Sequence, residues 1–357
     1  MSVLFSKLKL REIEFKNRVW VSPMCQYSSA NGLPTDWHLV HLGSRAVGGA
    51  GLVVVEATAV SPVGRISPGD SGMWSDQHAE AFKRITDFIV SQGAVPAIQL
   101  AHAGRKGSTE APWDGDASIP SSDERAWETL APSPIPFRPG WHTPRQMNGD
   151  DMARVTEEFV MATKRSFTAG FQVVEIHMAH GYLLHEFLSP LSNTRNDEFG
   201  GSFENRARFP LAVAKAVRNA WPARLPVFAR LSTTDWVPGG WTPEQSVTLA
   251  SLLKTTGIDL IDCSSGGATH DAKIPVGPSY QVPFAEMIRS QAGIATAAVG
   301  MITEALQAEG IIRDGQADAV FLARAMLHDP YWPLHAAETL GAPAGWPQQY
   351  GRVRPRK

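Results

Sequence analysis

Two histidines and a tyrosine stand within six positions of one another, directly after a short and largely apolar run. The run covers residues 173–176, and His177, His180 and Tyr182 follow it. Imidazoles donate hydrogen bonds at neutral pH and a phenol carries a proton, so the three groups could polarise a carbonyl oxygen and protonate a nearby carbon. Each of them alone is more often a packing residue. Their grouping favours a catalytic site.

Polar residues also end other apolar runs. Gln99 and Arg230 each end one, and a buried amide with a buried cation suits a flat ring with imide-like edges. For Arg230, a salt bridge within the core is the alternative. Cys25 follows Ser-Pro-Met at the end of the first run. A free cysteine is usually a small buried apolar residue, and the other interpretation is a modulator of a redox ring.

A regular alternation of segments must position these residues. Short apolar runs, most of them followed by a longer amphipathic segment, predict parallel strands with helical crossovers. The eight runs are 18–24, 51–58, 94–100, 172–177, 226–231, 259–264, 295–299 and 318–322. Helical spacing is clearest over 77–91 and 150–168. Closure of eight strands leaves no edge, so we predict an α/β fold, a (β/α)₈ TIM barrel.

Two stretches fall outside this alternation. Residues 1–17 alternate like a small hairpin that could plug one end of the barrel. Residues 103–148 are polar and rich in Pro and Gly, and they are too long for an ordinary connection between the third strand and its helix. We expect them to cap the active-site mouth. No domain boundary stands out, so residues 1–357 are expected to form a single domain.

The ends of the last two predicted strands favour a phosphate site. In such barrels the chemistry lies at the C-terminal ends of the strands, and the loops after strands seven and eight often hold a phosphate. Here these loops contain Gly300-Met301 and Ala323-Arg324. The alternatives are a plain turn for Gly300 and a surface ion pair for Arg324. Taken together, the two loops favour phosphate.

Composition excludes several classes of function. A net charge of −2 and an isoelectric point near 6.6 give no electrostatic reason to expect nucleic acid or anionic lipid as partner. Two cysteines, Cys25 and Cys263, fit a reducing compartment. The sequence has neither a signal-peptide pattern nor a membrane-length apolar run. We therefore expect a cytoplasmic protein.

Ungapped motifs run in order along almost the whole chain. They include Ser22-Pro-Met-Cys-Gln-Tyr27, Asp36-Trp-His38, Gln99–Lys106, Glu175–Leu184, Leu188–Asn193, Glu204-Asn-Arg206 and Arg324. With these motifs the chain resembles the Old Yellow Enzyme family of FMN-dependent ene-reductases, in the bacterial branch of the xenobiotic reductases and thermophilic-like enzymes.

The resemblance implies a tightly bound, non-covalent FMN and assigns its contacts. The ring would lie across the first strand, its pyrimidine edge would meet an amide and a guanidinium, and the last two loops would hold the phosphate. The residues at the ring are Pro23, Met24, Cys25 and Ala57. Those at its pyrimidine edge are Gln99 and Arg230, and those at the phosphate are Gly300, Met301, Ala323 and Arg324. Ala323 departs from the glycine that is usual in the family, and its methyl group crowds the approach to phosphate.

The resemblance also implies a mechanism. NADPH, or NADH in its place, reduces FMN and leaves, and an activated alkene then binds, in ping-pong order. His177 and His180 would hold the oxygen of an α,β-unsaturated carbonyl compound, a maleimide or a nitro compound. Flavin N5 would deliver hydride and Tyr182 would protonate the neighbouring carbon. Tyr27 matches a second phenol at the substrate site.

Assembly and two rival functions complete the expectations. The tail, residues 342–357, resembles a segment that brings Arg352 into a neighbouring subunit, which implies a homodimer or homotetramer; a frayed tail is the alternative.

A metal-dependent hydrolase with His102 among its ligands is disfavoured because the first strand offers no His-x-His pair or carboxylate. No metal is expected. A flavin-binding protein without turnover would not need the His pair and Tyr182. Trp236 and Trp241 receive no role.

Overall fold

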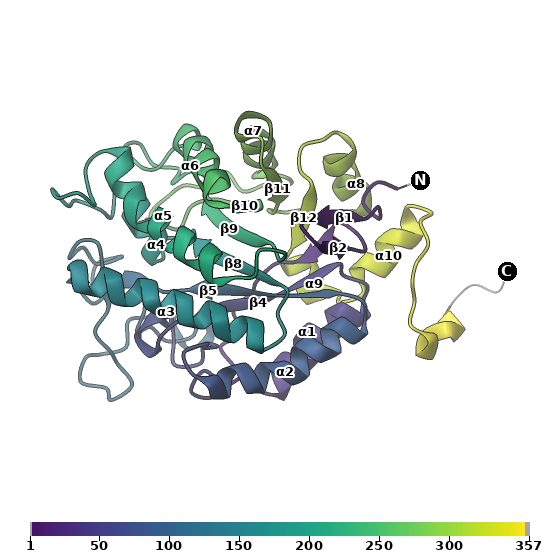
Figure 1. Ribbon diagram of the computed structural model, residues 1–357, viewed down its shortest axis with the longest axis horizontal. Coiled ribbons are helices and arrows are strands. Elements are labelled where there is room, and N and C mark those ends of the chain that lie inside the picture. Colours follow the sequence, from purple (N-terminus) through teal and green to yellow (C-terminus); the bar gives the residue numbers. More distant parts are fainter. Residues whose placement is uncertain (1, 354–357) are drawn as a thin grey trace.

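Eight parallel strands close into a barrel in the computed structural model, which describes residues 2–353 (Figure 1). The last strand pairs with the first barrel strand and so closes the ring. In chain order the strands are β3 (Val19–Val21), β4 (Leu52–Ala59), β5 (Val95–Ala101), β8 (Val173–Met178), β9 (Val227–Ser232), β10 (Leu260–Ser264), β11 (Ala295–Ala298) and β12 (Ala319–Leu322). The predicted (β/α)₈ barrel is confirmed.

The predicted strands agree with the observed ones to within about two residues, except for the first. A strand was expected over 18–24, whereas β3 ends at Val21. Ser22 still donates its N–H to the Leu322 carbonyl at 3.0 Å. Pro23 follows and has no N–H to donate, so the ladder stops there. The chain thereby leaves the barrel just before Cys25.

Helices cover the outside of the barrel (Figure 1). The longer ones are α1 (Asp36–Val47), α2 (Asp76–Ser91), α3 (Gly149–Thr168), α5 (Phe203–Ala220), α6 (Pro243–Thr256), α7 (Val282–Ala292), α8 (Ala305–Arg313) and α10 (Trp332–Thr339), and the short ones are α4 (Leu183–Leu188) and α9 (Arg324–His328). Helix α6 illustrates the local signals. Thr242 accepts a hydrogen bond from the Gln245 N–H at its start, and Gly257, with φ +96°, ends it.

The apolar face predicted for 77–91 is correct except at one residue. Phe82, Ile85 and Ile89 of α2 are buried against the barrel. Phe88 is 37% exposed because it lies at the edge of this face, over Gly43 of α1.

The barrel interior is layered, since alternate residues of each strand point inward. The lower layer is an apolar floor that includes Trp20, Val173, Phe228, Leu260 and Phe321. Two residues further along four neighbouring strands, the inward positions carry Gln99, Glu175, Arg230 and Asp262, and all four are buried. Strand register places Gln99 beside Glu175 and Arg230 beside Asp262. The barrel therefore carries a polar layer directly above its apolar floor.

The N-terminal hairpin closes the floor. Its strands β1 (Leu8–Leu10) and β2 (Ile13–Phe15) pair antiparallel. Phe15 is fully buried, and its ring centroid lies 4.8 Å from that of Trp20. The hairpin thus packs against the end of the barrel opposite the strand C-termini.

The stretch 103–148 contains little regular structure. It holds the 3₁₀ helices η2 (Gly104–Lys106) and η3 (Pro112–Asp114) and the two-residue strands β6 (Leu130–Ala131) and β7 (Arg145–Gln146). Another 3₁₀ helix, η1 (Pro62–Gly64), follows β4.

The C-terminal segment leaves the barrel after α10 and ends in η4 (Gln348–Val353), which Figure 1 shows standing away from the barrel. The Trp346 ring stacks on Tyr331 with centroids 6.3 Å apart, and the hydroxyl groups of Tyr331 and Tyr350 are 3.3 Å apart. Residues 354–357, the end of the predicted tail, lie outside the described residues. Within the described chain, no helix combines the length and the apolar character that a membrane span requires.

Candidate active site

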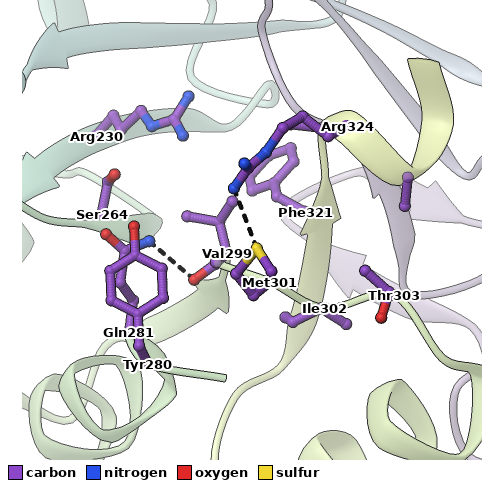
Figure 2. Close-up of a pocket in the computed structure, with 13 residues that line it drawn as sticks. Arg230, Ser264, Tyr280, Gln281, Val299, Met301, Ile302, Thr303, Phe321 and Arg324 are labelled. Atoms are coloured by element: carbon purple, nitrogen blue, oxygen red, sulfur yellow. Dashed lines mark hydrogen bonds between the residues drawn. The ribbon is translucent and has the colours of Figure 1, made fainter. Parts of the chain in front are cut away.

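A cavity of about 180 Å³ lies at the C-terminal ends of β9 to β12 (Figure 2). It brings together five of the residues expected to contact the cofactor, namely Arg230, Gly300, Met301, Ala323 and Arg324. Ser264, Tyr280, Gln281 and Val299 also line it. Pro23, Met24, Cys25, Ala57 and Gln99 are not among the residues that line this cavity. The first three follow β3, and the other two lie on β4 and β5.

Arg324 is an exposed cation at this cavity. Its Nη2 lies 3.2 Å from the Met301 sulfur (Figure 2). No carboxylate of the described residues lies within ion-pair distance of it. The alternative of a surface ion pair is therefore wrong within the described chain. An unpaired guanidinium at a cavity mouth is suited to bind an anion.

Gly300 allows the chain to turn tightly beside this cation. Its φ is +118°, and a Cβ at this position would stand 2.8 Å from Gln281 Nε2. Gln281 is itself held, because it donates to the Val299 carbonyl at 3.0 Å and accepts from Ser265 Oγ at 2.5 Å. A glycine is needed here for both conformation and space.

Arg230 forms the core salt bridge that was the alternative, and it also lies at the cavity. Its Nε lies 3.1 Å from Asp262 Oδ2, so the core salt bridge exists, although this contact is not aligned as a hydrogen bond. Its guanidinium group also lines the cavity, as Figure 2 shows. Gln99 is tied to the same layer, because its Nε2 donates to Glu175 Oε1 at 2.8 Å. Neither acid partner was predicted from the sequence.

His177 lies at the end of β8 and is 3% exposed. Its Nδ1 accepts a hydrogen bond from the Ala179 N–H at 3.3 Å. In the neutral ring the proton is therefore on Nε2, which becomes the donor. Burial, followed by the charge of Arg230, holds the pKa of His177 well below its usual value. The ring is thus a neutral hydrogen-bond donor at physiological pH.

His180 is held in place by two serines. Its backbone has φ +61°, its N–H donates to Ser232 Oγ at 2.9 Å, and its Nε2 lies 2.7 Å from Ser264 Oγ. Burial lowers the pKa of this ring too, with Arg230 and His177 adding to the effect. The two imidazole centroids are 5.2 Å apart. Ser264 also lines the cavity, so it links His180 to the cavity.

Tyr182 packs edge-on against His177, with ring centroids 5.0 Å apart. Burial raises the pKa of Tyr182 well above its usual value, with a further contribution from Cys25. Lys106 Nζ lies 5.0 Å from the centre of this ring and donates to the His180 carbonyl at 2.9 Å. The phenol is therefore protonated at neutral pH, and a cation lies over its ring.

Residues from the stretch 103–148 cover this group. Trp113 meets the Tyr27 ring edge-on with centroids 5.6 Å apart, and Lys106 Nζ lies 4.4 Å from the centre of the Phe137 ring. Tyr27 has φ +48°, and burial raises the pKa of its phenol. Trp113 and Phe137 were not predicted from the sequence, because no periodic pattern marks a residue in an irregular loop.

Cys25 lies in the chain segment that follows β3. The carboxylate of Glu56 accepts a hydrogen bond from the next N–H, that of Gln26, and also from Ser71 Oγ at 2.6 Å. Burial raises the pKa of the Cys25 thiol, and the charges of Asp70 and Glu56 raise it further. The thiol is therefore protonated, which disfavours a role as nucleophile.

The two tryptophans without an assigned role are both placed. Trp241 is 2% exposed, donates to Ser246 Oγ at 2.6 Å and stacks on Phe203, so it is a packing residue. Trp236 has φ +60° and packs edge-on against Phe284 of α7. In the described part of the chain, no three His, Cys, Asp or Glu residues are arranged to hold a metal ion.

Comparison with known proteins identifies the family. Residues 3–342 match the sequence profile of the NADH:flavin oxidoreductase / NADH oxidase family. The chain belongs to this family. It is an enzyme, a flavin-dependent NAD(P)H oxidoreductase with FMN as its bound cofactor, and the resemblance to the Old Yellow Enzyme family is confirmed.

Individual relatives align with almost the whole chain. The chain is 48% identical over 353 residues to an NADPH dehydrogenase from Geobacillus sp. (strain WCH70), and the alignment covers 98% of each chain. It is 45% identical over 351 residues to an NADPH dehydrogenase from Bacillus subtilis (strain 168), again with 98% of each covered. Among solved structures, morphinone reductase has a TM-score of 0.80 and 27% identity, with 96% of this chain and 91% of that chain covered.

The residues present fit FMN. The guanidinium of Arg324, which has no carboxylate partner among the described residues, lies at the same cavity as Gly300 and can bind a phosphate. The buried guanidinium of Arg230, whose Nε has no hydrogen-bond partner, can donate to the polar edge of a flavin ring. Ala323, in place of the usual glycine, lines the cavity directly before α9. Its methyl group adds one carbon to the wall where the phosphate is expected.

Proposed function

We propose that the enzyme is an NADPH-dependent ene-reductase. It would reduce the C=C bond of activated alkenes such as α,β-unsaturated carbonyl compounds, maleimides and nitro compounds. The observation that carries this proposal is the placement of a neutral His177, which presents an Nε2–H donor, against a protonated Tyr182 with ring centroids 5.0 Å apart. The name NADPH dehydrogenase, borne by the relatives, supports NADPH as the hydride donor.

The proposed cofactor contacts follow the cavity. Arg324 and the backbone near Gly300, Met301 and Ala323 would hold the phosphate, while Arg230 and Gln99 would hold the polar edge of the ring. Pro23, Met24, Cys25 and Ala57 would line the ring. When bound there, FMN would supply the redox chemistry, the transfer of a hydride between NADPH and the alkene.

His177 and His180 would bind the electron-withdrawing oxygen of the alkene. Both rings are neutral because burial and the Arg230 charge lower their pKa values. Neutral donors polarise a carbonyl oxygen without giving it a proton, so the β-carbon becomes electron-poor while the oxygen keeps its position. Ser264 and Ser232 fix His180 so that little reorganisation is needed.

Tyr182 would donate the proton to the α-carbon. Burial keeps the phenol protonated, and the Lys106 ammonium over its ring would stabilise the phenolate left behind. Tyr27, under Trp113, would border the same substrate.

The chain is also proposed to act as one domain over residues 1–357 and to assemble as a homodimer or homotetramer. Arg352, exposed on η4, would border the active site of a neighbouring subunit. Figure 1 shows η4 standing away from the barrel, which supports this proposal, because a segment outside the barrel, held through contacts such as that of Tyr350 with Tyr331, can reach another chain.

Tyr182→Phe tests the function. The variant should bind FMN and accept electrons from NADPH at the wild-type rate, while alkene reduction should fall by roughly 10²- to 10⁴-fold, the usual contribution of a positioned acid. Rapid-mixing absorbance measurements follow the two half-reactions separately. Undiminished alkene reduction in the variant would remove Tyr182 from its role, and failure of the wild-type protein to bind FMN would refute the whole proposal.

A further inference from the structure

The polar layer of the barrel has an unequal charge balance. Glu175 and Asp262 are both fully buried, and Arg230 is the one cation that the neighbouring strands place among them within the described chain. Asp262 has the nearer contact, with Oδ2 3.1 Å from Arg230 Nε. Glu175 instead accepts a neutral hydrogen bond from Gln99 at 2.8 Å. Two carboxylates thus face one guanidinium.

The hydrogen bonds of these acids are incomplete. Glu175 Oε2 and both oxygens of Asp262 have no hydrogen-bond partner. A buried ionised carboxylate without such partners costs several kcal/mol, and two of them near each other repel. The favourable arrangement is one ionised and one protonated acid, because a single guanidinium balances a single carboxylate. Asp262 has the ion pair with Arg230, so Glu175, which has none, is the one to carry the proton.

We propose that Glu175 and Asp262, here called the buried acid pair, hold one proton between them at neutral pH and thereby set the charge that Arg230 presents to the cofactor cavity. Both are positioning residues, since they act on the cofactor through Arg230. The inference rests on the proposed function, because it takes the flavin ring to lie over the polar layer.

The direction of the pKa shifts supports the assignment of the proton. Burial raises the pKa of both acids, and the charge of Asp262 raises that of Glu175 further, while Arg230 lowers both. Other titratable groups near the buried acid pair are few. His177 lies one layer above on β8 and is neutral, and the carboxylate of Glu56 on β4 is turned toward His38 and Ser71. Among residues 2–353, the buried acid pair and Arg230 then determine the charge of the layer.

The test measures the reduction potential of the FMN-loaded enzyme. The double variant Asp262→Asn/Glu175→Gln removes the ionised carboxylate, and its glutamine prevents position 175 from supplying a replacement charge. Arg230 is then uncompensated, so the more negative reduced flavin should be favoured by on the order of tenfold. A tenfold change corresponds to about 30 mV in the positive direction for a two-electron couple. Glu175→Gln should leave the potential unchanged at pH 7, since the glutamine replaces an acid that is already neutral. Cys263→Ala, next to Asp262 but packed on the outer face of β10, is the matched control.

A second measurement needs no variant. As the pH rises above neutral, Glu175 ionises in the wild-type enzyme, and the potential should fall more steeply with pH than it does in Glu175→Gln. If the double variant Asp262→Asn/Glu175→Gln does not fold, this difference in slope decides the matter. Equal potentials for wild type and the double variant, or identical slopes for wild type and Glu175→Gln, would overturn the inference. If FMN binds and alkene is reduced in those same samples, the proposed function still stands.

Discussion

Removal of the histidine pair one ring at a time tests the arrangement of the site. A phenolate places a negatively charged oxygen where a substrate carbonyl oxygen would lie, so its affinity measures the donors directly. The structure predicts that the two rings contribute unequally. His177 has an Nε2–H whose proton is fixed by the Ala179 bond at 3.3 Å, whereas Nε2 of His180 already lies 2.7 Å from Ser264 Oγ.

The magnitudes follow from this difference. His177→Ala removes a hydrogen bond to a charged oxygen and should weaken phenolate binding by about 1.5–3 kcal/mol, which is roughly 10- to 150-fold in dissociation constant. A ligand that bonds to Nε2 of His180 must first displace Ser264. His180→Ala should therefore cost only about 1 kcal/mol, the net value of an exchanged hydrogen bond. The rings are 5.2 Å apart, so the double variant need not equal the sum of the single ones.

The assay is a titration of each FMN-loaded variant with a para-substituted phenol, followed by the change in flavin absorbance. FMN content is measured first, because a loss of cofactor would mimic a loss of ligand binding. His335→Ala, at an exposed position of α10, is the control and should bind as the wild type does. Equal losses in the two single variants would refute the assignment of the His177 tautomer, and unchanged binding in the double variant would place the anchor elsewhere.

Three further predictions concern residues around this centre. Cys25→Ser should shift the flavin potential and change the balance of the half-reactions while retaining both, as measured by potentiometry and rapid mixing; loss of both with FMN retained would make Cys25 an essential acid or nucleophile. Truncation after Trp346 should raise the KM for the alkene and leave FMN content unchanged, and a monomer by sedimentation or unaltered kinetics would contradict an exchange of tails. Burial raises the pKa of Asp70 to about 7, so its folded-state proton stabilises the protein at low pH and this stability is lost as pH rises from about 4 to 7. Asp70→Asn should not lose stability over this pH range. At pH 8 its free energy of unfolding, measured in urea, should exceed that of the wild type by at most about 4 kcal/mol.

Local signals in the sequence were sufficient for the fold. Each barrel strand is a short apolar run followed by a helix with its own termination signals, so the eight units could be read one at a time. The error at the first strand had a local cause in Pro23. Because parallel strands end at the same rim, the polar residues after β8, β11 and β12 were also expected to meet there.

Side-chain partners, in contrast, depend on which strands become neighbours and in what register. The sequence singled out Arg230 and Gln99, but Asp262 and Glu175 read as interruptions of apolar runs until β5, β8, β9 and β10 stood side by side.

The cap and the proton positions also belong to the tertiary structure. Trp113, Phe137, Tyr280 and Gln281 come from irregular segments without periodicity, so only the folded chain brings them to Tyr27, Lys106 and the cavity. The protonation of a ring depends on burial and on charges from other strands, as His177 shows beside Arg230. The sequence alone thus determined the barrel and the residue types at its rim, because short-range periodicity specifies both. Which of these residues carry protons and charge was decided by the tertiary structure, since desolvation and Coulomb interactions act between strands that are distant in the chain.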